Sequence, residues 1–274
     1  MILLALNAAT QAAAPVQSLT DKQILAAIDQ TKRYFYAQQR PEDGAWARSP
    51  PFRGTAGADS MPDKGVTALV VHALLLSGET PQNPPLAKAI SFLQEADLDR
   101  TYDVAVRAHV WARLPPRYRR LLQRDAMWLL GAHDGKSRFR YTVQPESYDH
   151  SATQYALLGL WEAAKRGVPV PARFWQDAQT HFLNVQNNDG GWGYIGGNES
   201  KVSMTAAGLT ALLITQKQLE SKRGKNSAGL TESIDRGLGW LGQHFNADFR
   251  RGKTTDIFAI FSAAGAALFE VTGS

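Results

Sequence analysis

The chain has 274 residues, of which 44% are apolar and 20% charged, proportions that are ordinary for a globular protein. It contains no cysteine, which excludes disulfides, thiolate metal sites and cysteine nucleophiles. The formal net charge of +5 is not accompanied by a nucleic-acid-binding motif, so we expect no nucleic-acid partner.

The N-terminal segment, residues 1–20, begins with "MILLALNAATQAAAPVQ", which is apolar and then rich in alanine. Its small residues are typical of a signal-peptide cleavage region, but the positively charged start of a signal peptide is missing. Two interpretations stay open. The segment is either the remnant of a secretory signal, which implies an exported protein in the periplasm or outside the cell, or a lead-in to a cytoplasmic protein.

Residues 21–274 are predicted to form one all-α repeat domain. Amphipathic segments alternate with segments that carry almost no charge, and a helix that is apolar all round must be covered on all sides. We therefore expect an α/α toroid of concentric outer and inner helix layers, with about five helix pairs and no strands. The expected pairs, outer helix first, are 22–39 with 65–77, 86–96 with 101–113, 117–131 with 150–165, 171–186 with 203–218, and 231–245 with 256–271.

A short motif recurs between these helices. "YAQQRPEDGAW" (36–46) and "VQNNDGGW" (185–192) share a Gln, an Asp-Gly step and a Trp, and "GAHDGKSRFRY" (131–141) is a weaker copy. The Asp-Gly step is turn chemistry. We expect the amide of Gln186 to donate to the free carbonyls at the end of its own helix. Trp192 should be buried and should lock an outer helix to the next inner helix.

The longer stretches around two of these copies, "TKRYFYAQQRPEDGAW" (31–46) and "ARFWQDAQTHFLNVQNNDGGW" (172–192), resemble the QW repeat. That repeat marks the prenyltransferase and squalene-oxidase repeat family, which includes the terpenoid cyclases and the β subunits of protein prenyltransferases. The resemblance covers residues 20–272 and is closest to uncharacterised bacterial members. It implies the α/α-toroid fold.

The segment "YDHSATQYALLGL" (148–160) resembles the part of the prenyltransferase β subunits in which a histidine at the start of an inner helix binds zinc. This resemblance points to His150. The cysteine that completes the family's zinc site does not exist here, and the Asp-x-Asp-Asp motif of the cyclases is missing. We therefore expect no metal, no cofactor and no squalene cyclisation.

The candidate site follows from the toroid, because the N-termini of the inner helices gather around one opening, where free N–H groups favour anions and polar groups. The candidate catalytic residues there are His150, Asp149 and Asp103. The candidate substrate-binding residues are Tyr102, Arg107, Tyr148, Tyr194, Ser203, Thr205 and Asp256. N-capping is the alternative interpretation of each Asp, Ser and Thr. Asp103 and Arg107 are four residues apart, and an ion pair between them is expected unless Arg107 faces the cavity and binds an anion.

Two functions stay open. The first is a binding or scaffold module whose central cavity holds an apolar small molecule or lipid, such as an isoprenoid. The second is a non-canonical enzyme, a lyase, isomerase or transferase that acts on such a lipid in the cavity.

The surface of the toroid suggests two further contacts. The arginines of "RLPPRYRRLLQR" (113–124) either form a solvated outer face or touch an anionic membrane surface. The ring of five pairs is expected to be incomplete, and its last inner helix, 256–271, is apolar. Because a large apolar face needs a cover, we expect the N-terminal segment, a second copy of the chain in a homodimer, or a membrane to lie there.

Overall fold

The computed structural model describes residues 20–46, 63–142, 148–223 and 228–244. These residues form helices and turns, and no strand occurs among them apart from one isolated antiparallel bridge between Arg100 and Thr142. The all-α prediction is therefore confirmed. The predicted helix 256–271, Asp256 within it, and the segment 1–19 lie outside the described residues.

The chain divides into two compact units, residues 1–38 and 39–274. The described part of the first unit is helix α1 (Asp21–Ala37). A capping box begins this helix, since the Thr20 hydroxyl accepts the backbone N–H of Gln23 and the Gln23 side chain accepts the backbone N–H of Thr20.

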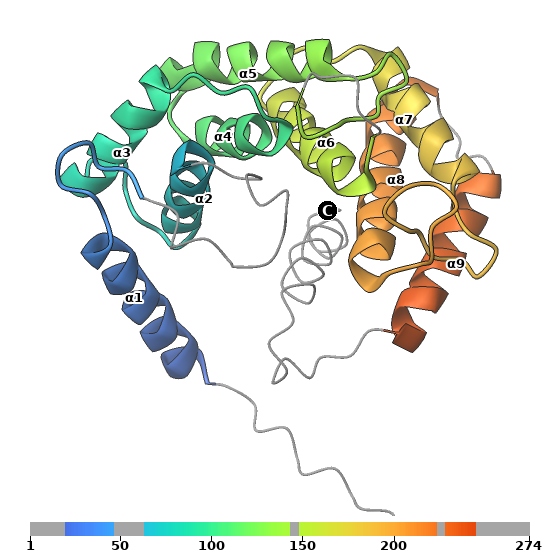
Figure 1. Ribbon diagram of the computed structural model, residues 1–274, viewed down its shortest axis with the longest axis horizontal. Coiled ribbons are helices and arrows are strands. Elements are labelled where there is room, and N and C mark those ends of the chain that lie inside the picture. The colour runs from blue at the N-terminus through green and yellow to red at the C-terminus, as the bar shows by residue number, and fades with distance from the viewer. Residues whose placement is uncertain (1–19, 47–62, 143–147, 224–227, 245–274) are drawn as a thin grey trace, which may run out of the picture. The chain divides into compact units, whose positions relative to one another are not determined.

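The second unit arranges its helices in two rows, which Figure 1 shows side by side. The helices of the first row pack on one another in chain order, and each helix of the second row packs against a neighbour in the first. We call these the inner row and the outer row. The inner row consists of α2 (Asp63–Leu76), α4 (Thr101–Arg113), α6 (His150–Lys165) and α8 (Val202–Arg223). The outer row consists of α3 (Pro84–Glu95), α5 (Arg119–Ala132), which follows the short 3-10 turn Pro116–Tyr118, α7 (Ala172–Asn184) and α9 (Ala228–His244).

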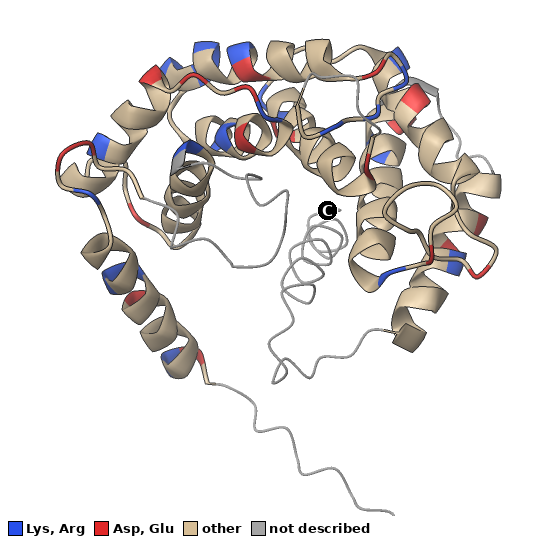
Figure 2. Ribbon diagram, viewed as in Figure 1, with Lys and Arg blue, Asp and Glu red and all other residues tan. Residues whose placement is uncertain are grey.

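The two rows differ in burial as the sequence predicted. α7 buries a single stripe that includes Phe174, Ala178 and Phe182, and Figure 2 shows charged residues along α5 and α7. α4 and α6 are buried along almost their whole length. They approach closely because Gly159 has no side chain, and a Cβ there would lie 3.1 Å from the Cα of Ala105. None of the described helices is both long enough and apolar enough to cross a bilayer.

Each copy of the recurring motif folds into the same turn. The aspartate carboxylate accepts the backbone N–H two residues later, at 3.0 Å for Asp43, 2.9 Å for Asp134 and 2.9 Å for Asp189. The glycine after each aspartate has a positive φ, of 77°, 81° and 96° respectively, which a side chain would strain. The Asp-Gly step therefore turns the chain before the next inner-row helix begins.

Each turn ends in an aromatic residue whose backbone N–H donates to a threonine hydroxyl on the next inner-row helix. We call this hydrogen bond the threonine link. The three links are Trp46 to Thr67 at 3.0 Å, Phe139 to Thr153 at 3.0 Å, and Trp192 to Thr205 at 3.1 Å. All three threonines are fully buried, so the link also satisfies a backbone donor that water does not reach.

The glutamine of the motif connects its own turn to an outer-row helix. The Gln186 amide donates to the Gly190 carbonyl of its own turn and to the Ser233 carbonyl of α9, both at 2.8 Å. Gln39 likewise donates to its own turn and to Pro85 of α3, the latter at 2.8 Å. The expectation that Gln186 binds its own helix end is wrong, because α7 ends two residues earlier and the side chain extends beyond that end towards α9.

Trp192 is fully buried, as predicted, and contacts three helices. Its indole N–H donates to the Phe182 carbonyl of α7 at 2.9 Å. Its ring occupies the space above Gly208 of α8 and Gly237 of α9, where an added Cβ would lie 2.5 and 2.8 Å from ring atoms. The indole therefore fills a slot formed by two glycines.

We expect Trp192→Ala to lower the unfolding free energy by about 3–5 kcal/mol, because the substitution leaves a cavity between three helices. Urea unfolding followed by circular dichroism would measure the loss. Trp161→Ala on α6 is the matched control, because Trp161 is partly exposed. Equal losses in the two variants would contradict the special position of Trp192.

Candidate functional site

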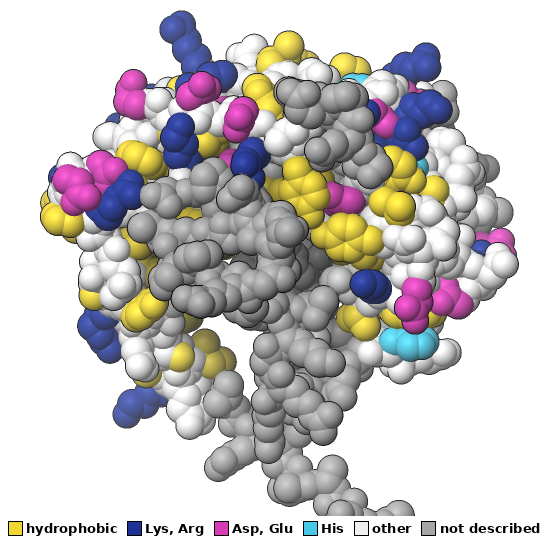
Figure 3. Space-filling model, viewed as in Figure 1, with side chains coloured by type: hydrophobic (Ala, Val, Ile, Leu, Met, Phe, Trp, Pro, Cys, Tyr) yellow, Lys and Arg dark blue, Asp and Glu magenta, His cyan; other side chains and the backbone are white. Residues whose placement is uncertain are grey.

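The N-terminal ends of α4 and α6 lie next to a cluster of tyrosines. The ring of Tyr102 lies 5.3 Å from that of Tyr141 and 4.9 Å from that of Tyr155, and the hydroxyls of Tyr141 and Tyr194 are 3.3 Å apart. Burial raises the pKa of Tyr102 and Tyr141, and it raises the pKa of Tyr155 to about 12. These hydroxyls therefore stay protonated at neutral pH. Figure 3 shows hydrophobic side chains at the surface around the N-terminal end of α6.

Asp149 caps α6. Its carboxylate accepts the backbone N–H of Ala152 at 2.6 Å, as an N-cap does. Burial raises its pKa to about 6, and the backbone hydrogen bonds oppose this shift. The carboxylate makes no hydrogen bond to the neighbouring His150, whose ring nitrogens bind elsewhere.

His150 is fully buried and binds through both ring nitrogens. Its Nδ1 lies 2.7 Å from the carbonyl of Gly193, and its Nε2 lies 3.1 Å from Nε2 of His181 on α7. A carbonyl only accepts, so Nδ1 carries the hydrogen, and His181 must donate its Nε2–H to His150. Burial lowers the pKa of His150 to about 4 and of His181 to about 3, so both rings are neutral at pH 7.

Asp103 is the most unusual member of the site. Its side chain is 1% exposed, and neither carboxylate oxygen has a hydrogen-bond partner among the described residues. Burial raises its pKa to about 7, although the positive charges of Arg100 and Lys64 act in the opposite direction. A carboxyl with a pKa near 7 is partly protonated at neutral pH, so it can both give up and take a proton there.

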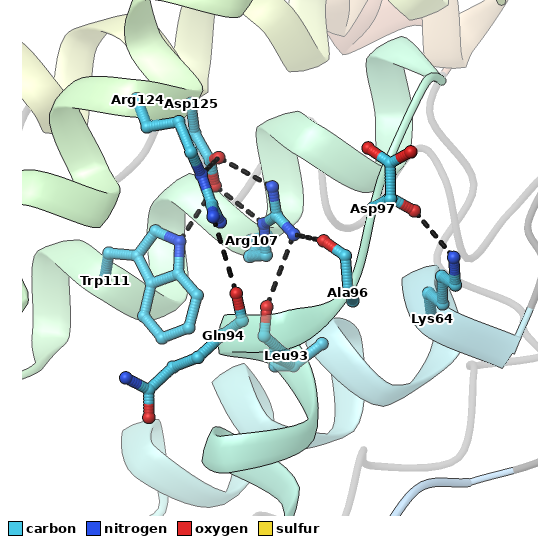
Figure 4. Close-up of polar contacts among 9 residues, drawn as sticks. All are labelled: Lys64, Leu93, Gln94, Ala96, Asp97, Arg107, Trp111, Arg124 and Asp125. Carbon is cyan, nitrogen blue, oxygen red and sulfur yellow. Dashed lines mark hydrogen bonds and ion pairs between the residues drawn. The ribbon is translucent and has the colours of Figure 1, made fainter.

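The predicted ion pair between Asp103 and Arg107 is wrong. Arg107 is buried and donates to both carboxylate oxygens of Asp125 on α5, at 2.7 and 2.8 Å (Figure 4). It also donates to the carbonyls of Leu93 and Ala96 at the end of α3. The Asp125 carboxylate is buried and accepts two N–H groups of Arg107 at once, so Arg107 pairs with it and not with Asp103 one turn away on its own helix. The structure thus places Arg107 in a separate network, in which Trp111 also donates to Asp125.

The remaining candidates divide between the site and the turns. The ring of Tyr148 contacts His181, with 5.0 Å between ring centroids, and lies under the guanidinium of Arg138 at 4.2 Å. The backbone carbonyl of Tyr194 accepts the backbone N–H of His150 at 2.9 Å. Ser203 and Thr205 are buried at the start of α8, where the Thr205 hydroxyl accepts the backbone N–H of Trp192 in the threonine link. In the described ranges, no group of three His, Asp or Glu side chains is placed to hold a metal ion.

One group of partly exposed side chains on the inner row was not predicted from the sequence. Along α2 and α6, partly exposed and mostly apolar side chains recur at helical spacing. His72 of the α2 stripe meets His109 of α4, with ring centroids 5.2 Å apart, and α6 packs on the same helix α4. We call this surface the apolar face. It comprises Val66, Leu69, His72 and Ala73 of α2, His109 of α4, and Tyr155, Leu158 and Trp161 of α6.

No model of a known protein family matches the sequence, and no curated protein matches it. The family resemblance therefore depends on the motifs themselves.

We expect Asp103→Asn to raise the unfolding free energy by about 2–4 kcal/mol near pH 8, because a buried, unpaired carboxylate no longer has to ionise in the folded state. The gain should shrink as the pH falls from about 7 to about 4, since the folded protein then holds the proton. Urea unfolding at several pH values would measure both effects.

Asp125→Asn is the matched control for this substitution. It leaves the buried Arg107 without its carboxylate, so it should destabilise the protein by about 3–5 kcal/mol. A gain from Asp103→Asn that does not change with pH would contradict the unpaired state of that carboxylate.

Four histidines that are wholly or partly buried make the stability depend on pH. Burial lowers their pKa to about 3 or 4, so they stay neutral in the folded protein while the unfolded chain takes up protons below about pH 6.5. The four are His72, His109, His150 and His181. Asp103 and Asp149 act in the opposite direction, because their raised pKa values let the folded state bind protons first.

With four groups against two, we expect the unfolding free energy to fall as the pH decreases from about 6.5 to about 4. Asp103→Asn should make this fall steeper, because it removes one of the opposing groups. A flat or rising profile from urea unfolding would show that the histidines are not held neutral in the folded state.

Proposed function

We propose that the chain is a binding module of the α/α-toroid type, related to the prenyltransferase and squalene-oxidase repeat proteins, that holds an apolar, isoprenoid-like ligand against its inner row. The apolar face carries this proposal. It consists of partly exposed aliphatic and aromatic side chains of α2 and α6, two inner-row helices that both pack on α4, and of His109 on α4 itself. The threonine links and the glutamine contacts support the relation to the QW repeat.

The chemistry of the apolar face suits a ligand without charge. His72 and His109 are neutral at physiological pH because burial lowers the pKa of both rings. Tyr155 stays protonated, and its hydroxyl is the type of group that orients an alcohol or ether oxygen. Apolar surface removed from water on binding would supply the main part of the affinity.

Farnesol, an isoprenoid alcohol, is a direct probe of this proposal. We expect the full chain to bind farnesol in native mass spectrometry and in titration calorimetry, and we expect Leu158→Asp to lower the affinity about tenfold or more, because it places a charge in the middle of the apolar face. Leu69→Ser is a second, milder substitution of the same face.

The matched control is Met127→Asp. Met127 is 57% exposed on α5 of the outer row, so its substitution adds the same charge away from the apolar face. Absence of farnesol binding to the wild-type chain, or equal weakening by Leu158→Asp and Met127→Asp, would show that the apolar face is not the binding surface.

A second candidate function is an enzyme that protonates such a ligand, and Asp103 favours it. Its carboxyl lies at the start of α4 and has a pKa of about 7, raised by burial. It has no hydrogen-bond partner among the described residues. Mass spectrometry of the recovered lipid separates the two functions. A binding module returns farnesol unchanged, whereas an enzyme yields a product that the Asp103→Asn variant does not form.

Three further properties stay predictions. They are membrane contact through the arginines of 113–124, a homodimer through the C-terminal helix 256–271, and export of the protein.

A further inference from the structure

A groove of about 440 Å³ lies on the outer row, between one face of α7 and the turn that follows α5. The residues that α7 contributes are spaced so that they share one side of the helix. The groove-lining side chains used below are Lys136, Arg138, Arg173, Asp177 and His181.

The groove carries positive charge. The guanidinium of Arg138 is held by the carboxylate of Asp134 at 2.6 Å, and Arg173 lies 3.4 Å from Asp177. Lys136 makes no ion pair with a described residue. Three cations against two carboxylates leave one net positive charge, with the Lys136 ammonium available to a ligand.

His181 adds a hydrogen-bond acceptor to this basic groove. Its Nε2–H is donated to His150, and the ring is neutral. Its Nδ1 therefore holds a lone pair, and it makes no hydrogen bond to a described residue. A ligand that suits the groove must accept from cations and also donate one hydrogen.

We propose that this groove binds a phosphate group that still carries a proton. The charged oxygens accept from Lys136 and Arg173, and the P–OH donates to Nδ1 of His181. Sulfate and carboxylate groups have no hydrogen to donate near neutral pH. The proposal is independent of the apolar face, which is on the inner row. The same chemistry is offered by inorganic phosphate and by a phosphomonoester lipid headgroup.

Titration calorimetry at about pH 6.5 tests the chemistry with inorganic phosphate and sulfate. We expect phosphate to bind at least about tenfold more tightly, because sulfate places an oxygen lone pair against the lone pair of His181. Binding to lipid vesicles shows whether the phosphate group belongs to a lipid headgroup or to free phosphate. Retention on phosphatidic acid but not on phosphatidylglycerol, a diester, without affinity for inorganic phosphate would assign a lipid headgroup.

Charge variants test the location. Lys136→Gln and Arg173→Gln should each weaken binding about tenfold, whereas Lys217→Gln, which removes an exposed lysine on α8, should leave it unchanged. The proposal is overturned if phosphate and sulfate bind equally, if neither phosphate nor phosphatidic acid vesicles bind, or if Lys217→Gln weakens binding as much as Lys136→Gln.

Discussion

The threonine link is the contact on which the second unit depends. A backbone N–H at the end of each turn meets a buried hydroxyl on the next inner-row helix, and the geometry is nearly the same in three copies. The threonine link also fixes the position of the candidate site. Gly193, whose carbonyl orients the His150 ring, directly follows the linked residue Trp192. A displaced turn would therefore move the hydrogen-bond partner of His150 and, through it, that of His181.

Most of the helices could be predicted because their signals are local. The predicted bounds of 101–113 and 150–165 coincide with α4 and α6, since charge-poor segments with polar N-terminal residues mark both the extent and the start of a helix. The partner of Gln186 could not be predicted in the same way. Ser233 lies 47 residues further along the chain, and only the packing of α9 beside α7 brings its carbonyl within reach.

In the candidate site, too, the features with local signals could be predicted and the long-range contacts could not. Asp149 and His150 were identifiable as the start of an inner-row helix, whereas His181 resembled one more member of the buried stripe of α7. Arg107 shows where local spacing misleads. A carboxylate four residues away on the same helix offers a few tenths of a kcal/mol, about 0.2–0.5, and the bidentate contact with Asp125 on another helix outweighs it. Asp103 therefore makes no ion pair with Arg107, and burial raises its pKa.

The threonine link also works across connections of unequal length. Its two ends are separated by 21 residues in the first copy, 14 in the second and 13 in the third. A hydrogen bond between a turn and a helix does not depend on how much chain runs between them, and loop closure costs little more as that chain lengthens. These connections are therefore the natural insertion points of the repeat, where a new loop or a grafted peptide can be added while the helices stay joined as before.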